Sequence, residues 1–256
     1  MIGWEYVVLV NFVDLHCHAL FRLDDGAHNE EVMKKMIDIA YEDGTRYLCF
    51  TPHFKIYEFD SEDEVYSHMQ RMDRRFKVAC EYANEKYPEM SLFLGNEIMY
   101  HSDIPDSLLS KKCHFLGDSS YALVEFEPNC SAFEIENITI RLLRKGIRPL
   151  IAHVERYSAV VKDLSLAMSL KESGALLQVN ARSVTRFKFG KIAKFLKQAF
   201  KKELIDVIAS DAHNDTSFSP SLSKAYEHIS KNYGTNYANC IFHDKPLAIL
   251  MNKNAF

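Results

Sequence analysis

The sequence predicts an α/β fold whose parallel strands form a closed or distorted barrel. Seven short runs rich in β-branched and aromatic residues occur along the 256 residues, and helical patterns separate them. Such alternation is typical of βαβ crossovers, which place successive strands side by side in a parallel sheet. No change in composition and no linker-like stretch interrupts the chain, so we expect one domain over residues 1–256.

The predicted strands share a short apolar run that is followed by turn-forming or helical residues. We expect them at 7–16, 46–53, 91–97, 121–127, 148–154, 175–181 and 206–212. Seven strand–helix units fit a barrel better than an open sheet.

Three segments between these strands have clear helical patterns. In residues 29–44, Asn29 is a suitable N-cap and Gly44 ends the apolar stripe. Residues 61–87 keep apolar side chains at helical spacing over a longer stretch. Residues 188–204 are basic on one face and apolar on the other, and we expect an outer helix of the barrel rather than a membrane-binding helix. Its inward side chains are expected to be Ile192, Phe195, Leu196 and Ala199.

The composition is ordinary for a globular protein and gives no basic surface. Hydrophobic residues make up 47% and charged residues 26%, and the net charge is −4, so we expect no nucleic-acid partner. No apolar run reaches the roughly 18 residues that a spanning helix needs, and the N-terminus lacks the features of a secretory signal. The six cysteines form no C-x-x-C pair, which is typical of reduced thiols in the cytoplasm. The oligomeric state stays open.

Polar residues stand where the predicted strands end. Six of the seven runs end in a group that can ligate a metal, and the seventh ends in the amide of Asn180, which can orient a ligand. The potential ligands are His16 and His18, His53, Glu97, Glu125, His153, and Asp211 with His213. Because the carboxyl ends of parallel strands meet on one face of the fold, we expect these side chains to share one pocket.

The stretch "VDLHCHALFRLDDGAHN", residues 13–29, supplies part of this pocket. Taken alone, an H-x-H on a strand is most often a surface pair, and an Asp-Asp-Gly is most often a turn. Their occurrence together with the other strand ends favours a metal site. On a strand, His16 and His18 share one side while Cys17 faces the other, so we expect Cys17 to be a packed thiol. Asp25 brings the candidate ligands to nine.

The chemistry of the donor set limits the metal. Imidazoles and carboxylates without thiolates suit Mn, Fe, Zn or Co better than a structural zinc. One ion takes roughly three or four protein ligands in a catalytic zinc-like site, so nine groups predict two or three ions. Such centres activate water and hold phosphate oxygens.

These residues lie in stretches that resemble the PHP superfamily of metal-dependent phosphoesterases. More narrowly, the chain resembles bacterial protein-tyrosine phosphatases of capsule and exopolysaccharide loci. The matching stretches run in family order over positions 14–214: "DLHCH", "DDGA", "TPHF", "GNEIMY", "YALVEFE", "PLIAHVERY", "LLQVNARSVTRFKFG" and "VIASDAHN". The first motif is shared by many hydrolases, whereas "DDGA", "AHVERY" and "ASDAHN" together are far more specific.

The resemblance implies a distorted (β/α)7 TIM-like barrel of the PHP type with a trinuclear site, most readily of manganese. The first implied ligand set is His16, His18, Glu97 and Asp211. The second set is Glu97, Glu125 and His153, and the third is Asp25, His53 and His213. Arg156, in "HVERY", is implied to bind the substrate phosphate as a bidentate guanidinium.

The implied activity is hydrolysis of phosphotyrosine on a protein by a metal-activated hydroxide. The implied substrate is the tyrosine kinase of a capsule or exopolysaccharide assembly system. The chain departs from the family where an arginine commonly follows "SDAHN", since Phe218 stands there. Arg182 and Arg186 stand where the family favours small residues. Either could supply a substitute cation for the missing arginine, but we expect both to be solvent-exposed surface arginines.

Other functions are compatible with parts of the pattern. Another PHP phosphoesterase would act on histidinol phosphate or a nucleotide, although "DDGA" and "HVERY" argue against it. Because of Phe218, a weakly active or non-catalytic module that binds a kinase tail stays open. A cysteine phosphatase is excluded, since no cysteine is followed six positions later by an arginine, and no P-loop motif occurs. The other histidines receive no role: His28, His68, His101, His114, His228 and His243.

Overall fold

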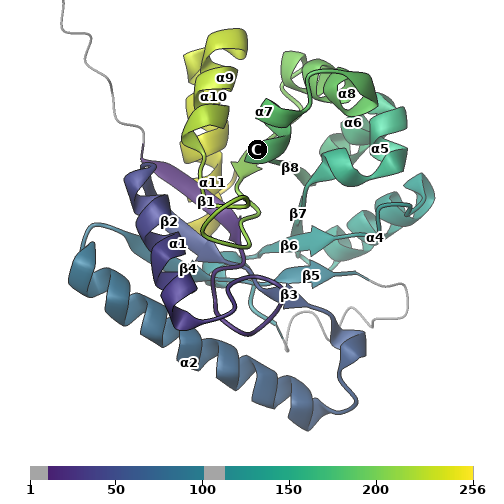
Figure 1. Cartoon of the computed structure of the whole chain (residues 1–256). Helices are drawn as coiled ribbons and strands as arrows, with labels where there is room; N and C mark the ends of the chain where they lie inside the picture. Colours follow the sequence, from purple (N-terminus) through teal and green to yellow (C-terminus); the bar gives the residue numbers. More distant parts are fainter. Residues whose placement is uncertain (1–10, 101–112, 256) are drawn as a thin grey trace, which may run out of the picture.

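The computed structural model describes residues 11–100 and 113–255. Figure 1 shows a strongly curled parallel sheet with helices around its outside. The strands are β1 (Phe12–Cys17), β2 (Thr45–Phe50), β3 (His53–Phe54), β4 (Ser91–Leu94), β5 (Glu97–Met99), β6 (Tyr121–Glu125), β7 (Arg148–Ile151), β8 (Leu176–Asn180) and β9 (Val207–Ala209). Their order is β1-β2-β4 in one sheet and β3-β5-β6-β7-β8-β9 in the other, with all pairs parallel.

Backbone hydrogen bonds join the two sheets into one curved surface. β2 and β3 are separated only by residues 51–52, and β4 and β5 only by residues 95–96. The N–H of Gly95 donates to the carbonyl of Phe50 at 2.8 Å, so the pairing continues across the second gap. The sheet curls far enough that the His18 N–H donates to the Ala212 carbonyl at 2.8 Å, beyond the ends of β1 and β9.

Each of the seven predicted strand runs overlaps at least one strand of the structure, and the strands are parallel as predicted. The second and third runs are each split into two strands, which the sequence did not predict. Residues 7–10 of the first predicted strand, and His101, lie outside the described residues.

The helices alternate with the strands. Their bounds are α1 (Glu30–Glu42), α2 (Glu62–Lys86), α4 (Ala132–Arg144), α5 (Ser158–Lys162), α6 (Leu164–Ser173), α7 (Ala181–Arg186), α8 (Gly190–Lys201), α9 (Ser223–Tyr233), α10 (Thr235–Asn239) and α11 (Lys245–Leu250). A short 3-10 turn, η3 (Val154–Arg156), follows β7. Among the described residues, none of these helices combines the length and apolar character needed to cross a membrane.

Local signals in the sequence explain where the helices begin and which face they bury. The Asn29 side chain accepts a hydrogen bond from the Val32 N–H at 2.9 Å, which caps α1 as predicted. Gly44 follows α1 with φ of 104°, a left-handed conformation that favours glycine. In α8, Phe195, Leu196 and Ala199 are buried and Ile192 is half-buried, so the prediction of an inward apolar face is confirmed.

Apolar side chains fill the space inside the curved sheet at the end opposite the predicted pocket. One core cluster joins residues from β1, β6, β7 and β9 to α11, whose Ile249 and Leu250 are buried. A second cluster lies between β1, β2 and the helices α1 and α2, and it contains Cys17. Cys17 is therefore a packed thiol, as predicted, and the polar residues of β1 are left for the other end of the sheet.

Candidate metal centre

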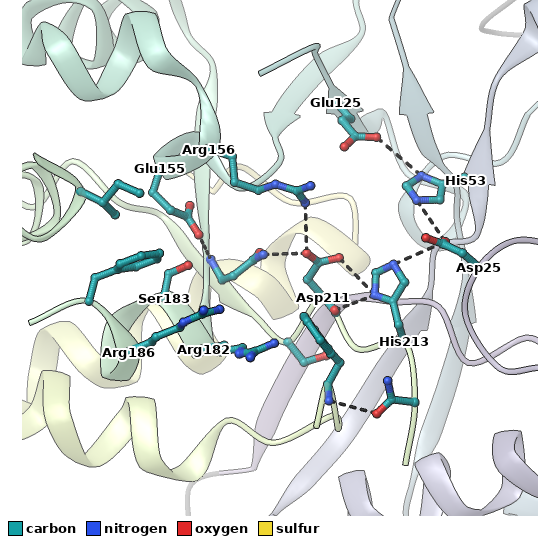
Figure 2. A pocket seen from close by; sticks show the side chains of 16 residues that line it. Asp25, His53, Glu125, Glu155, Arg156, Arg182, Ser183, Arg186, Asp211 and His213 are labelled. Atoms are coloured by element: carbon teal, nitrogen blue, oxygen red, sulfur yellow. Dashed lines mark hydrogen bonds and ion pairs between the residues drawn. The ribbon is translucent and has the colours of Figure 1, made fainter. Parts of the chain in front are cut away.

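All nine predicted ligand residues lie together at one edge of the curved sheet, at the ends of the predicted strand runs. His16, Glu97 and Glu125 belong to β1, β5 and β6, and His53 begins β3. The others stand in the loops that directly follow strands: His18 and Asp25 after β1, His153 after β7, and Asp211 and His213 after β9. Figure 2 shows Asp25, His53, Glu125, Asp211 and His213 directed toward one another.

Glu97 is the central acid of this group. Its Oε1 atom lies 2.8 Å from Nε2 of His153 and 3.3 Å from Nε2 of His16. Its Oε2 atom lies 2.9 Å from Nδ1 of His53 and 3.3 Å from Nε2 of His18. A carboxylate that contacts four imidazoles with two oxygens is placed to bridge cations.

The ligand atoms fall into four overlapping sets, each within 4.8 Å. The sets are His16, Glu97 and His153; His16, His18 and Asp211; His53, Glu97 and Glu125; and His18, Asp25, His53 and His213. The last contains all of the third predicted set and adds His18. Several side chains belong to two sets, which is the arrangement expected where adjacent ions share ligands.

Hydrogen bonds on the far side of the imidazoles fit a metal centre. His18 donates from Nδ1 to Oδ2 of Asp24 at 2.7 Å, and His16 donates from Nδ1 to Oε1 of Gln178 at 3.2 Å. His213 donates from Nδ1 to the Asp211 carbonyl at 2.9 Å. Each of these rings therefore turns Nε2 toward the group of ligands, and this is how metal-binding histidines are usually oriented.

Several nitrogen and oxygen atoms of the ligand residues also lie so close together that a shared cation would stabilise them. Nε2 of His16 and Nε2 of His18 are 3.1 Å apart. Oε2 of Glu97, Oε2 of Glu125 and Nδ1 of His53 are buried and make no hydrogen bond within the described chain, although two of them are only 2.9 Å apart. Buried oxygens without a partner are costly, so the donor set fits divalent cations that accept nitrogen and oxygen ligands.

Without ions, protons on the imidazoles compensate the acids. Burial alone would raise the pKa of Glu97, but the neighbouring His16 and His153 hold this pKa well below its usual range. Burial alone would lower the pKa of His153, yet its hydrogen bonds to Glu125 and Glu97 raise that pKa to about 10. Metal binding would therefore displace protons from this site.

Two residues that orient ligands were not assigned from the sequence. Asp24 accepts from His18 and also from the His53 N–H at 2.9 Å, and these contacts help hold its pKa at about 2 despite burial. Gln178 accepts from the His153 N–H at 2.9 Å in addition to its contact with His16. A glutamine inside the apolar run "LLQVN" was the available signal.

Asn180 and Gly26 have roles that follow from their positions. Asn180 donates from Nδ2 to Oδ2 of Asp211 at 2.6 Å, so the amide orients a ligand as predicted. A Cβ atom at Gly26 would lie 1.9 Å from the His18 carbonyl oxygen. The glycine of "DDGA" therefore permits the loop to fold against His18, which brings Asp25 toward His53 and His213, both 3.5 Å from Oδ1.

A cavity of about 520 Å³ opens beside the nine residues. Three arginines line it: Arg156, Arg182 and Arg186. Nη1 of Arg156 lies 3.5 Å from Oδ2 of Asp211, and its side chain is 48% exposed, so the guanidinium can reach a ligand. Arg186 is exposed as predicted, but the same prediction for Arg182 is wrong, because Arg182 is half-buried and stacks 3.9 Å over the Phe218 ring.

Comparison with known proteins gives concordant matches over nearly the whole chain. A family described as capsular polysaccharide synthesis, CpsB/CapC, matches residues 12–251. The tyrosine-protein phosphatase CpsB of Streptococcus pneumoniae is 32% identical over 94% of this chain and 99% of its own length. The tyrosine-protein phosphatase YwqE of Bacillus subtilis is 28% identical over 95% and 93%. A solved structure from work on YwqE and CpsB, described as unique metal-dependent tyrosine phosphatases, superposes with a TM-score of 0.80 at 25% identity, covering 95% and 96%.

Proposed function

The chain belongs to the CpsB/CapC family of capsular polysaccharide synthesis proteins, and we propose that it is a metal-dependent phosphatase that hydrolyses phosphotyrosine on proteins. The observation that carries this proposal is the convergence of five imidazoles and four carboxylates beside a cavity lined by arginines. The names of the relatives identify the same activity, and the cavity accounts for it chemically.

The nine side chains would hold two to three divalent ions, for which manganese is our first choice. The proposed ligands are His16, His18, Asp25, His53, Glu97, Glu125, His153, Asp211 and His213. Bound ions would lower the pKa of a water molecule and offset the negative charge on the phosphoryl oxygens. Asp24, Gln178 and Asn180 keep the ligands in place for this chemistry through the hydrogen bonds described above.

Arg156 binds the phosphoryl group in this proposal. A guanidinium presents parallel N–H groups that match two phosphoryl oxygens, and it stays charged at any working pH. During hydrolysis a water oxygen bonds to phosphorus while the bond from phosphorus to the tyrosyl oxygen breaks. The phenolate is a good leaving group, so a proton donor to it is dispensable.

The cavity wall suits an aryl ester. Phe187 and Ile192 line it together with the arginines, and Ile192 is part of the apolar face of α8. A phenyl ring that enters the cavity can lie against these side chains while its phosphate reaches the ligand residues. This apolar contact favours phosphotyrosine over a small hydrophilic phosphate ester.

The proposal also covers the protein substrate, the cellular compartment and the type of domain. The substrate in this proposal is the tyrosine kinase of a capsule or exopolysaccharide assembly system. The proposed compartment is the cytoplasm, where reducing conditions keep thiols free, as all six cysteines are here. Residues 1–256 form one metallophosphatase domain with the distorted (β/α)7 barrel of the PHP type. The hydrogen bond between His18 and Ala212 supports a barrel, since it joins the first and last strands.

Activity measurements with and without a chelator test the function. The protein loaded with manganese should release phosphate from a phosphotyrosyl peptide, and thorough treatment with EDTA followed by gel filtration should abolish this release. Readdition of manganese should restore it. Activity that survives chelation, or turnover of histidinol phosphate or a nucleotide in preference to the peptide, would contradict the proposal.

A further inference from the structure

We propose that Arg182, held in place by the ring of Phe218, is a second phosphate-binding residue of the cavity. The inference rests on the proposed function and adds to it, because it assigns phosphate binding to a residue that the sequence analysis expected to be exposed and named only as an alternative cation. It begins from the position of the side chain. Figure 2 shows Arg156 above and Arg182 below Asp211, so the two guanidinium groups line the same cavity next to this ligand residue.

The guanidinium of Arg182 has unused hydrogen-bonding capacity. Its Nη1 atom is buried and has no hydrogen-bond partner in the described part of the chain. A buried N–H that lacks an acceptor is unfavourable, and more so for a charged group. Because Arg182 lines the cavity, an oxyanion bound there would give its guanidinium an acceptor, and a phosphoryl group offers several oxygens for this purpose.

The ring of Phe218 contacts the guanidinium of Arg182. The central carbon of the Arg182 guanidinium lies 3.9 Å from the centroid of the Phe218 ring, a cation–π contact that restricts the position of the guanidinium. The two residues are 36 positions apart in the sequence, so the contact depends on the folded arrangement of α7 and the loop after β9.

The loop that carries Phe218 is itself ordered by the site. Phe218 donates from its N–H to Oδ1 of Asn214 at 3.0 Å, and its carbonyl accepts from the His213 N–H at 2.9 Å. His213 is one of the nine proposed ligands. Phe218 is therefore tied by backbone hydrogen bonds to a ligand residue and acts as a positioning residue for Arg182.

Direct binding of inorganic phosphate tests the inference separately from turnover. Titration calorimetry of the manganese-loaded full chain with phosphate should show at least about tenfold weaker binding for Arg182→Gln, since hydrogen bonds to charged groups contribute roughly 1.5–3 kcal/mol. Arg182→Lys should recover part of the affinity, and Arg144→Gln, which removes an exposed charge on α4, should match the wild type. Circular dichroism and metal content confirm that each variant is folded and loaded.

The role of Phe218 needs a separate comparison. Phe218→Ala should weaken phosphate binding less than Arg182→Gln does, and Phe218→Tyr should restore it because a tyrosine ring stacks equally well. In the double variant the two effects should not add, since Phe218 acts only through Arg182. Additive effects would overturn the positioning role.

The same variants separate the inference from the proposed function. If Arg182→Gln binds phosphate as tightly as the wild type does, the inference is wrong even when the wild type hydrolyses phosphotyrosine. If phosphate binding depends on Arg182 but phosphotyrosyl peptide is not hydrolysed, the anion site stands and the proposed function fails. When both stand, Arg182→Gln should also lower kcat/KM by at least about tenfold.

Discussion

Nδ1 of His53 and Oε2 of Glu97 lie 2.9 Å apart in the protein interior, and neither makes a hydrogen bond within the described chain. An imidazole nitrogen and a carboxylate oxygen so close together need a proton or a cation between them. A divalent cation that contacts both atoms would also satisfy Oε2 of Glu125, which is buried and makes no hydrogen bond within the described chain. This relationship is a structural argument that the buried acids and imidazoles can serve as metal ligands.

Replacement of the central acid should remove both metal and activity. Glu97→Gln keeps the shape of the side chain but replaces one oxygen, so it can no longer bridge as a carboxylate. We expect a loss of activity larger than the roughly 10- to 100-fold that follows loss of a residue orienting a ligand. Elemental analysis and peptide turnover check this, with Glu172→Gln on the surface of α6 as the control. Normal metal content in Glu97→Gln would contradict its bridging role.

Asp24 should control metal affinity without touching the metal. Asp24→Asn cannot accept from His18, His53 and the Gly26 N–H all at once, since one of its two oxygens becomes an amide. We expect manganese affinity to fall by roughly 10- to 100-fold, measured by competition with a metal indicator. The exposed Asp63→Asn is the matched control. Equal affinities in the two variants would show that Asp24 has no orienting role.

Gly26 should tolerate no side chain. In Gly26→Ala the new Cβ would lie 1.9 Å from the backbone oxygen of His18, and a backbone atom cannot move as a flexible side chain does. We expect the variant to lose about 1–3 kcal/mol of unfolding free energy or more, together with manganese affinity. Urea unfolding of the metal-free and loaded forms measures both. Wild-type values in both forms would exclude the close approach of this loop.

Asp38 offers a test of stability that is independent of the site. It joins α1 to α2 by accepting from Tyr82 Oη at 2.7 Å, Lys86 Nζ at 2.9 Å and Tyr87 Oη at 2.9 Å. Although partial burial acts to raise its pKa, these donors lower the pKa from its ordinary value of 3.8. A lowered folded-state pKa means that this stabilisation is complete above pH 3.8 and is lost as the pH falls through the lowered pKa.

The Asp38→Asn variant measures that contribution. At pH 7 we expect it to unfold with about 1–3 kcal/mol less free energy than the wild type, and the difference should shrink as the pH falls below about 4. Peptide turnover should be unchanged, because α1 and α2 lie outside the sheet. A difference that grows at low pH would show that the sign of the pKa shift is wrong.

Much of the fold was predictable because the apolar runs and the polar residues after them are local features. The splits at residues 51–52 and 95–96 were not predicted, because each predicted strand was continued through Thr51-Pro52 or Gly95-Asn96 to the polar residue that follows. The sequence also could not distinguish Asp24 from Asp25. The fold turns the first toward the Nδ1 side of His18, where it is buried, and leaves the second 71% exposed facing His53 and His213.

The error on Arg182 has a similar origin. An arginine in a polar segment is usually exposed, and nothing near it in the sequence indicates stacking. Its partner Phe218 lies in a loop whose position depends on β9 and on Asn214, so the contact is a property of the tertiary structure. Residues that orient ligands, such as Gln178, were missed for the same reason.

The most direct test of the central claim is anomalous diffraction from a crystal grown with manganese. The account predicts two or three anomalous peaks between the strand ends, each within coordination distance of side chains from the nine ligand residues, with Glu97 at the centre of the group. A crystal with manganese in excess that shows no peak there, or a peak only elsewhere on the molecule, would contradict it.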